Sequence, residues 1–399
     1  MITARIRTAF VPHDLKAPLK GAESGPLAGL TIAIKDMYDI AGERTGGGNP
    51  DWLAAQKPAT SNASVVQKLL DAGGTITGKT ICDEFFYSIA GVNAHYGTPN
   101  NPRAPGRLPG GSSSGSASAA ASGACDIAIG SDTGGSARVP ASFCGLYGIR
   151  TTHGRIDLGG AMHMAASFDA CGWFSNVPGT FRKVGEVLLG GEGATNAEIK
   201  NLVLLSDAFA EADGEVSDLM QQALSTMASD LPSPSRQRIA PDGLDSWREA
   251  FRLIQSREIW SVYGDFVEQV KPKFGPGVAE RFAAAAKVSE EQAAEARVIQ
   301  ERARDRIRSI AQPGTLLVLP TCPAIAPLTH APNELHEAFR LRAMRMTCIA
   351  GLSGLPQLSL PVGALGGRPV GLSFIGWAGG DEALLDLAVK LSRYCGLAA

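Results

Sequence analysis

The sequence lacks the features that are typical of membrane and nucleic-acid-binding proteins. No apolar run approaches the roughly 20 residues that a helix needs to cross a bilayer. The 37 Lys and Arg residues are balanced by 39 Asp and Glu residues, which leaves a net charge of −2. No cluster of basic residues stands out, so we expect neither nucleic acid nor a membrane among the partners of this chain.

Targeting and metal-binding signals are scarce as well. The first ten residues carry two arginines but no apolar core follows them, so they do not resemble a signal peptide. The seven cysteines are odd in number and never have Cys-x-x-Cys spacing, which indicates reduced, buried thiols. His153 and His163 are too far apart for a local zinc pair. We therefore expect a cytoplasmic protein with no metal site and no cofactor.

Glycine and serine, in contrast, are concentrated in the stretch 109–136. Gly-Gly-Ser occurs there twice, at residues 110–112 and 134–136. An alanine-rich run at 116–121 favours a helix, and an apolar run at 125–129 favours a buried strand. Because glycine lets the backbone approach a ligand closely, each serine is placed where successive N–H groups can converge on one atom.

Two other interpretations of this stretch are disfavoured. A flexible linker would not contain a helix former and a strand former, nor continue directly into the apolar segment 139–147. A phosphate-binding loop would end in Gly-Lys-Ser/Thr or follow the Gly-x-Gly-x-x-Gly pattern, and neither cluster does.

The two clusters resemble the signature of the amidase signature family. The similarity covers residues 110–117 and 130–142, and the apolar segment 30–36 resembles the strand that carries the family's lysine. Further family features recur as far as residue 321, and the similarity is weakest between about 190 and 290. The resemblance implies an α/β fold, in which helices cover both faces of a large mixed sheet, and the hydrolysis of amides.

The resemblance also implies a Ser–cis-Ser–Lys triad, which would place the nucleophile at Ser136, the bridging serine at Ser112 and the base at Lys35. A serine hydroxyl attacks a carbonyl efficiently only when a base takes its proton. Burial lowers the pKa of a lysine, so a neutral Lys35 would accept the proton through Ser112. The peptide bond before Ser112 should be cis. A Ser-His-Asp triad through His153 is not required.

Backbone amides near Ser136 are the natural stabilisers of the tetrahedral oxyanion. We expect this oxyanion hole to be formed by four consecutive residues: Thr133, Gly134, Gly135 and Ser136. Arg138 is a candidate substrate clamp, and a structural pair with Asp132 is an equally good interpretation.

A closer resemblance, to one group within the family, suggests the acyl part of the substrate. Segments around the signature look closest to plant indole-3-acetamide hydrolases, which favours an aryl or arylalkyl primary amide. Ser113 is a further candidate substrate contact. The candidate apolar lining consists of Phe86, Tyr87, Phe143, Met162 and Met164. Each of these five side chains could equally belong to the core. The neighbouring Asp83 and Glu84 are expected to form salt bridges or caps.

Strands interleaved with helices predict one α/β domain over residues 1–399. We expect a polar, irregular arm at 1–26 and a more variable helical region at 190–300. The predicted strands are 27–36, 75–78, 125–129, 200–206, 315–319, 358–361 and 370–375, and residues 139–150 should return into the sheet. The predicted helices include 64–72, 337–350 and 383–391.

Two alternatives to a free amidase stay open at this point. One is the glutaminase-type subunit of a tRNA-dependent amidotransferase, which shares the signature and passes ammonia to a partner. The other is a non-catalytic scaffold with the same fold, against which the presence of Lys35, Ser112 and Ser136 argues. A small-molecule amide is the expected partner, and a homodimer is compatible with the sequence.

Overall fold

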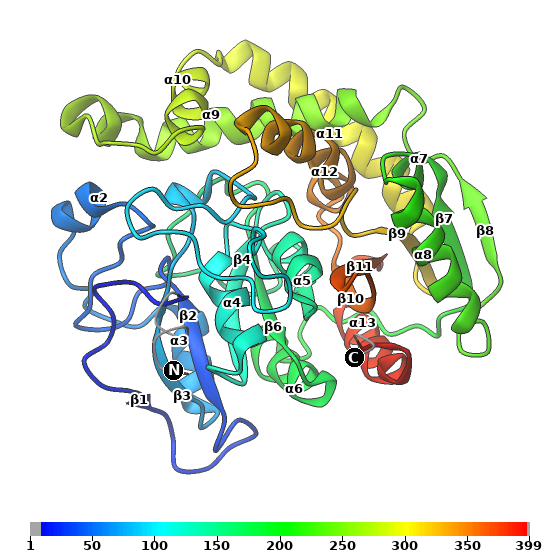
Figure 1. Cartoon of the computed structure of the whole chain (residues 1–399), viewed down its shortest axis with the longest axis horizontal. Coiled ribbons are helices and arrows are strands. Elements are labelled where there is room, and N and C mark those ends of the chain that lie inside the picture. Colours follow the sequence, from blue (N-terminus) through cyan, green and yellow to red (C-terminus); the bar gives the residue numbers. More distant parts are fainter. Residues whose placement is uncertain (1–8, 397–399) are drawn as a thin grey trace.

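A mixed sheet of 11 strands forms the centre of the computed structural model, which describes residues 9–396 (Figure 1). The strand order across the sheet is β1-β3-β2-β4-β6-β5-β10-β11-β9-β7-β8. The strands are β1 (Leu19–Lys20), β2 (Thr31–Lys35), β3 (Thr75–Thr80), β4 (Ile127–Asp132), β5 (Tyr147–Arg150), β6 (Ala170–Ser175), β7 (Asn201–Leu205), β8 (Pro234–Gln237), β9 (Thr315–Pro320), β10 (Gln357–Leu365) and β11 (Arg368–Ile375). The predicted α/β class with a large mixed sheet is confirmed.

Helices connect most of these strands. They are α2 (Pro50–Ala55), α3 (Ser64–Asp71), α4 (Ser114–Ser122), α5 (Arg138–Cys144), α6 (Pro178–Leu189), α7 (Ser206–Ala210), α8 (Gly214–Thr226), α9 (Leu244–Val270), α10 (Val278–Ala285), α11 (Glu290–Ile310), α12 (Asn333–Ser353) and α13 (Asp381–Lys390). Short 3₁₀ turns lie at Glu84–Phe86 and Ser392–Tyr394. The long helices α9, α11 and α12 pack on one another at the top of Figure 1. No described helix combines the length and the apolar character that crossing a membrane requires.

Alternating side chains explain why helices cover both faces of the sheet. Along β2, Ile32 and Ile34 face the core to which α3, α6 and α13 contribute, whereas Ala33 faces α4 and α5. In β4, Ile129 and Ala128 repeat this alternation. Because the sheet presents alanine side chains on this face and α4 is itself rich in alanine, the helix packs closely on the sheet. The predicted cover on both faces is therefore present.

The segment after the second serine cluster differs from its prediction. Residues 139–150 were expected to return into the sheet as a whole, but residues 138–144 form α5 and only 147–150 form a strand. Gly145, with φ +63°, ends the helix in the left-handed region that suits glycine. The strand predicted at 125–129 is also displaced. It runs from Ile127 to Asp132 as β4, because its last residues pair with β6. The start of the second motif is thus part of a strand.

The N-terminal arm is more ordered than its composition suggests. Of the predicted arm 1–26, residues 1–8 lie outside the described part. Leu19 and Lys20 form β1, which pairs antiparallel with β3, and Phe10 bridges to Thr80 on the same edge. Val11 is buried. The arm therefore covers an otherwise open edge of the sheet, which a polar pattern alone does not reveal.

Candidate active site

Lys35 occupies the last position of β2, between the parallel neighbours β3 and β4. Its side chain is fully buried. The Nζ atom donates to Ser112 Oγ and to Ser131 Oγ, each at 2.8 Å. The lysine therefore contacts the predicted bridging serine directly, and a second hydroxyl holds it from the side of β4.

Burial lowers the pKa of Lys35 to about 8. The negative charges of Asp83, Asp132 and Asp169 oppose this effect, because they stabilise the ammonium form. The ring centroid of Phe86 lies 4.8 Å from Nζ. A lysine in this environment has a substantial neutral fraction in mildly alkaline solution, which is what a general base requires.

Ser112 is presented by a tight segment that leads into α4. The Gly111–Ser112 peptide bond is cis, as the resemblance implies. The Asp83 N–H donates to the Ser112 carbonyl at 3.2 Å, and the Gly111 N–H donates to the carbonyl of Ile89 at 2.8 Å. A Cβ atom on Gly111 would lie 2.4 Å from Asp83 Oδ2. A side chain at position 111 would therefore collide with the Asp83 carboxylate, so glycine is required directly before Ser112.

Ser136 lies in the loop between β4 and α5, which is folded around the Asp132 carboxylate. The carboxylate accepts the amide hydrogens of Gly135 at 3.0 Å, Ala137 at 3.1 Å and Arg138 at 3.3 Å. Within residues 9–396, the amide groups of Gly134 and Ser136 have no hydrogen-bond partner. Of the four amides predicted to form the oxyanion hole, that of Gly135 is thus already bonded, whereas those of Thr133, Gly134 and Ser136 donate to no acceptor within residues 9–396.

Two side chains hold this loop from opposite sides. Thr133 Oγ1 donates to Asp169 Oδ1 at 2.6 Å, and Thr347 Oγ1 of α12 donates to the Gly134 carbonyl at 2.7 Å. Gly135 has φ +123°, and a Cβ atom there would come within 3.0 Å of Thr347 Cγ2. The loop is therefore fixed before any ligand arrives.

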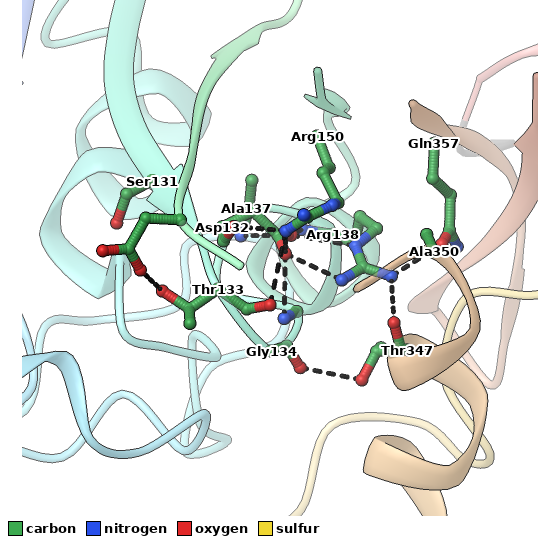
Figure 2. Close-up of polar contacts among 12 residues, drawn as sticks. Ser131, Asp132, Thr133, Gly134, Ala137, Arg138, Arg150, Thr347, Ala350 and Gln357 are labelled. Atoms are coloured by element: carbon green, nitrogen blue, oxygen red, sulfur yellow. Dashed lines mark hydrogen bonds and ion pairs between the residues drawn. The ribbon is translucent and has the colours of Figure 1, made fainter. Parts of the chain in front are cut away.

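Asp132 is itself held by two buried arginines (Figure 2). Arg138 binds it through Nη2–Oδ1 at 2.7 Å and Nε–Oδ2 at 2.9 Å, and Arg150 Nη1 lies 3.3 Å from Oδ1. Burial by itself would raise the pKa of this carboxyl, but the two guanidinium groups hold it well below its usual range. Asp132 is a permanent anion that organises the loop.

The Ser136 side chain borders a cavity of about 20 Å³. The residue is only 3% exposed. In the part of the chain that the structure describes, no hydrogen bond joins the Ser136 hydroxyl to the Ser112 hydroxyl. The contact between the two serines that the predicted proton relay requires is therefore not formed in this structure. Catalytic hydrogen bonds commonly tighten only when substrate binds.

Comparison with known proteins identifies the family. The family model described as Amidase matches residues 7–191 and 247–385. This chain belongs to the Amidase family. Amidase 1 of Arabidopsis thaliana is 38% identical over 416 residues, covering 97% of this chain and 98% of that protein. Family and relatives together support an enzyme that hydrolyses amides.

Two further matches bear on the details. A solved structure described as "Crystal structure of amidase" superposes with a TM-score of 0.83 at 27% identity, covering 93% of this chain and 86% of that one. A glutamyl-tRNA(Gln) amidotransferase subunit from a Synechococcus strain is 31% identical, covering 92% of this chain and 83% of that protein. The amidase is thus similar both to free amidases and to one component of an amidotransferase.

Only some of the predicted apolar lining of the amidase lies at Ser136. Phe86, Tyr87 and Met164 border the same small cavity as Ser136. Phe143 lines a larger cavity of about 620 Å³ beside it, and Met162 lines a separate hollow near Asp39.

Two predicted substrate contacts of the amidase instead hold its backbone. Ser113 Oγ exchanges two 3.2 Å hydrogen bonds with the backbone of Ser131. Arg138 is fully buried and, besides Asp132, donates through Nη1 to the Thr347 carbonyl and to Gln357 Oε1. Of the two roles considered for Arg138, the pair with Asp132 is the one observed.

The sequence reasoning missed Ser131 and underestimated Asp83. Ser131 lies near the end of β4 and Asp83 follows β3, where the three parallel strands β2, β3 and β4 end. Ser131 contacts Lys35 directly, and Asp83 acts on it through its charge. Polar residues at the carboxyl ends of adjacent parallel strands are a known signal for a site. Burial raises the pKa of Asp83 to about 6. Among residues 9–396, no group of three metal-ligating side chains comes together.

Proposed function

We propose that this amidase hydrolyses a small primary carboxylic amide through an acyl-enzyme on Ser136. The observation that carries the proposal is the 2.8 Å contact between Ser112 and a buried Lys35 of lowered pKa. Neutral Lys35 accepts the Ser112 proton while Ser112 takes the Ser136 proton, and Ser136 Oγ adds to the amide carbon. The reverse transfer protonates the departing nitrogen, and ammonia leaves. Water then cleaves the acyl ester by the same relay.

The oxyanion of the tetrahedral intermediate would be bound by the amides of Gly134 and Ser136. Their lack of any other partner among residues 9–396 supports this role, as does the fixed conformation of the loop. Removing one such donor typically costs about 3–4 kcal/mol of transition-state stabilisation. Gly135 then contributes by its backbone conformation rather than by its N–H group.

An aryl or arylalkyl acyl group is the proposed substrate class. Phe86, Tyr87 and Met164 lie beside Ser136, and Tyr87 and Phe143 line the adjacent cavity of about 620 Å³, which has the room and the apolar surface for such a group. The similarity to Amidase 1 agrees with a free amidase. A cytoplasmic location and a homodimer stay predictions.

The decisive experiment replaces the nucleophile. Ser136→Ala should abolish ammonia release while the protein stays folded, because the hydroxyl that forms the acyl ester is gone. A serine-directed acylating reagent should label the wild-type peptide that contains Ser136, as measured by mass spectrometry. Ser122→Ala, at the exposed end of α4, is the matched control and should keep wild-type activity. Label on Ser112 or on a cysteine would reverse the assignment.

A glutaminase-type role is the second candidate, since the amidotransferase component is 31% identical. The two functions differ in the preferred amide. A free arylalkyl amidase should show a higher kcat/KM for phenylacetamide than for glutamine. Better turnover of glutamine would favour the amidotransferase role, and no ammonia from any amide would favour a non-catalytic scaffold.

A further inference from the structure

Two arginines from the helical cover reach the cavity at Ser136. Arg281 of α10 and Arg340 of α12 line both the small cavity and the adjacent cavity of about 620 Å³. Their side chains are only 16% and 18% exposed. Neither helix carries a residue of the proposed relay, so these cations have no part in the proton transfers described above.

The two arginines share a single carboxylate. Arg281 Nη1 lies 3.1 Å from Glu337 Oε1, and Arg340 Nε lies 2.7 Å from Glu337 Oε2. The two arginines make one further hydrogen bond within residues 9–396, from Arg340 Nη1 to the Met344 sulfur at 3.1 Å. Arg281 Nε is buried without a partner. Since each guanidinium carries five N–H groups, the pair retains donors that face no acceptor within residues 9–396.

Within residues 9–396, no hydrogen bond joins the other carboxylates of the cavity wall to either arginine. Glu84 accepts from Asn49, His95 and the Gly275 amide, and Glu280 accepts from the Gly277 amide. Asp83 also interacts electrostatically with Arg281, but it accepts from the Gly91 amide and burial raises its pKa to about 6. Arg252, a third cation of the wall, is already paired with Glu249 through two hydrogen bonds. The Arg281–Glu337–Arg340 cluster itself combines two guanidinium groups with one carboxylate, which leaves one positive charge in excess.

We propose that Arg281 and Arg340 bind a carboxylate on the acyl part of the substrate, so that an amide with a terminal carboxylate is preferred over the uncharged amide of the same length. A planar carboxylate matches the fork of a guanidinium, and partial burial strengthens such a charge-assisted bond. The inference rests on the proposed function at Ser136. It adds a terminal anion to the aryl or arylalkyl group proposed above.

The test compares amides that differ in the terminal charge. The first pair is glutaramate and pentanamide, and the second is 4-(carbamoylmethyl)benzoate and 4-methylphenylacetamide. The charged member of each pair should have the higher kcat/KM by about 10- to 100-fold, as expected for a hydrogen-bonded charge. Equal values, or a preference for the neutral amides, would overturn the inference.

Variants of the cluster should shift this charged-to-neutral ratio in opposite directions. Arg340→Met and Arg281→Met should each lower it about tenfold or more. Glu337→Gln frees both arginines from their shared carboxylate and should raise it. Arg252→Met removes a cation of the same wall that is already paired, so the ratio should stay near wild type. An unchanged ratio in the Arg340 and Glu337 variants would refute the arginine subsite.

A binding measurement separates this inference from the proposed function. Glutarate should bind to Ser136→Ala, measured by calorimetry, and Arg340→Met added to that variant should weaken binding about tenfold or more. Loss of turnover without glutarate binding would uphold the nucleophile and refute the arginine subsite. Glutarate binding together with persistent turnover in Ser136→Ala would uphold the subsite and refute the nucleophile.

Discussion

Lys35 is the buried side chain that we expect to set the pH range of the enzyme. Its pKa of about 8 means that the neutral amine, the form that accepts a proton, becomes abundant as the pH rises through that value. We expect kcat/KM to increase with pH along a limb with an apparent pKa near 8. Lys35→Ala should lower kcat by about 10²–10⁴-fold. A flat pH profile, or a Lys35→Ala variant near the wild-type rate, would contradict the relay.

Asp83 should influence the pH at which kcat/KM rises. Its negative charge stabilises the ammonium of Lys35, so Asp83→Asn should lower the lysine pKa and move the limb to lower pH. The shift requires an ionised Asp83, whose own pKa is about 6, so it should be visible in profiles measured above pH 6. Asp126→Asn is a control at the surface, where that carboxylate bonds Thr31. A limb displaced to higher pH would show that Asp83 does not act through its charge.

At the scale of an element, the β4–α5 loop depends on a buried ion cluster. Asp132→Asn leaves Arg138 and Arg150 buried without their counter-charge, and such a loss typically costs about 3–5 kcal/mol. Urea unfolding at neutral pH should show this destabilisation. Glu186→Gln, which removes an exposed partner of Arg182, should change stability by less than about 1 kcal/mol.

The same cluster predicts a direction for the pH dependence of stability. Because the folded-state pKa of Asp132 is depressed, its stabilisation is fully present above the pKa of the unfolded chain and is lost as the pH falls through the folded value. The difference between wild type and Asp132→Asn should therefore shrink in strong acid. A constant difference from neutral to acidic pH would argue against an ionic origin.

At the scale of the whole molecule, the catalytic loop is held by residues far along the chain. Thr347 donates to the Gly134 carbonyl across 213 positions. Thr347→Val keeps the shape of the side chain but removes this bond. We expect kcat to fall about tenfold with little change in KM, because the oxyanion donors lose their support while the substrate pocket stays intact. A change confined to KM would instead place Thr347 in substrate binding.

This long-range support explains what the sequence could and could not predict. Lys35, Ser112 and Ser136 were predicted because the local motifs that contain them resemble those of the amidase signature family, and the structure brings Lys35 and Ser112 into contact. Their catalytic roles stay predictions until the variants are measured. Arg281 and Arg340 were not predicted because nothing local distinguishes them from the other arginines of the helical region 190–300 and of α12.

Predictions from local composition were wrong or undecided where contacts between distant parts of the chain determine the structure. The arm before β2 has a polar sequence, but it is ordered by pairing with β3. Arg138 was considered as a substrate clamp because it follows Ser136 closely, yet β4, α12 and β10 supply the partners that bury it. Neither contact can be inferred from residues that are neighbours in the chain.

The separation between the sheet and its helical cover has an evolutionary consequence. The residues proposed for proton transfer come from β2, from the segment before α4 and from the β4–α5 loop, whereas Arg281 and Arg340 come from α10 and α12. Substitutions at Arg281 and Arg340 would alter which acyl group is recognised without displacing the proposed proton-transfer residues, whereas Thr347 of α12 supports the β4–α5 loop and has to be retained. Specificity and reactivity can therefore diverge independently among descendants of one ancestral enzyme, and laboratory variation of α10 and α12 with Thr347 retained offers a direct route to new substrates.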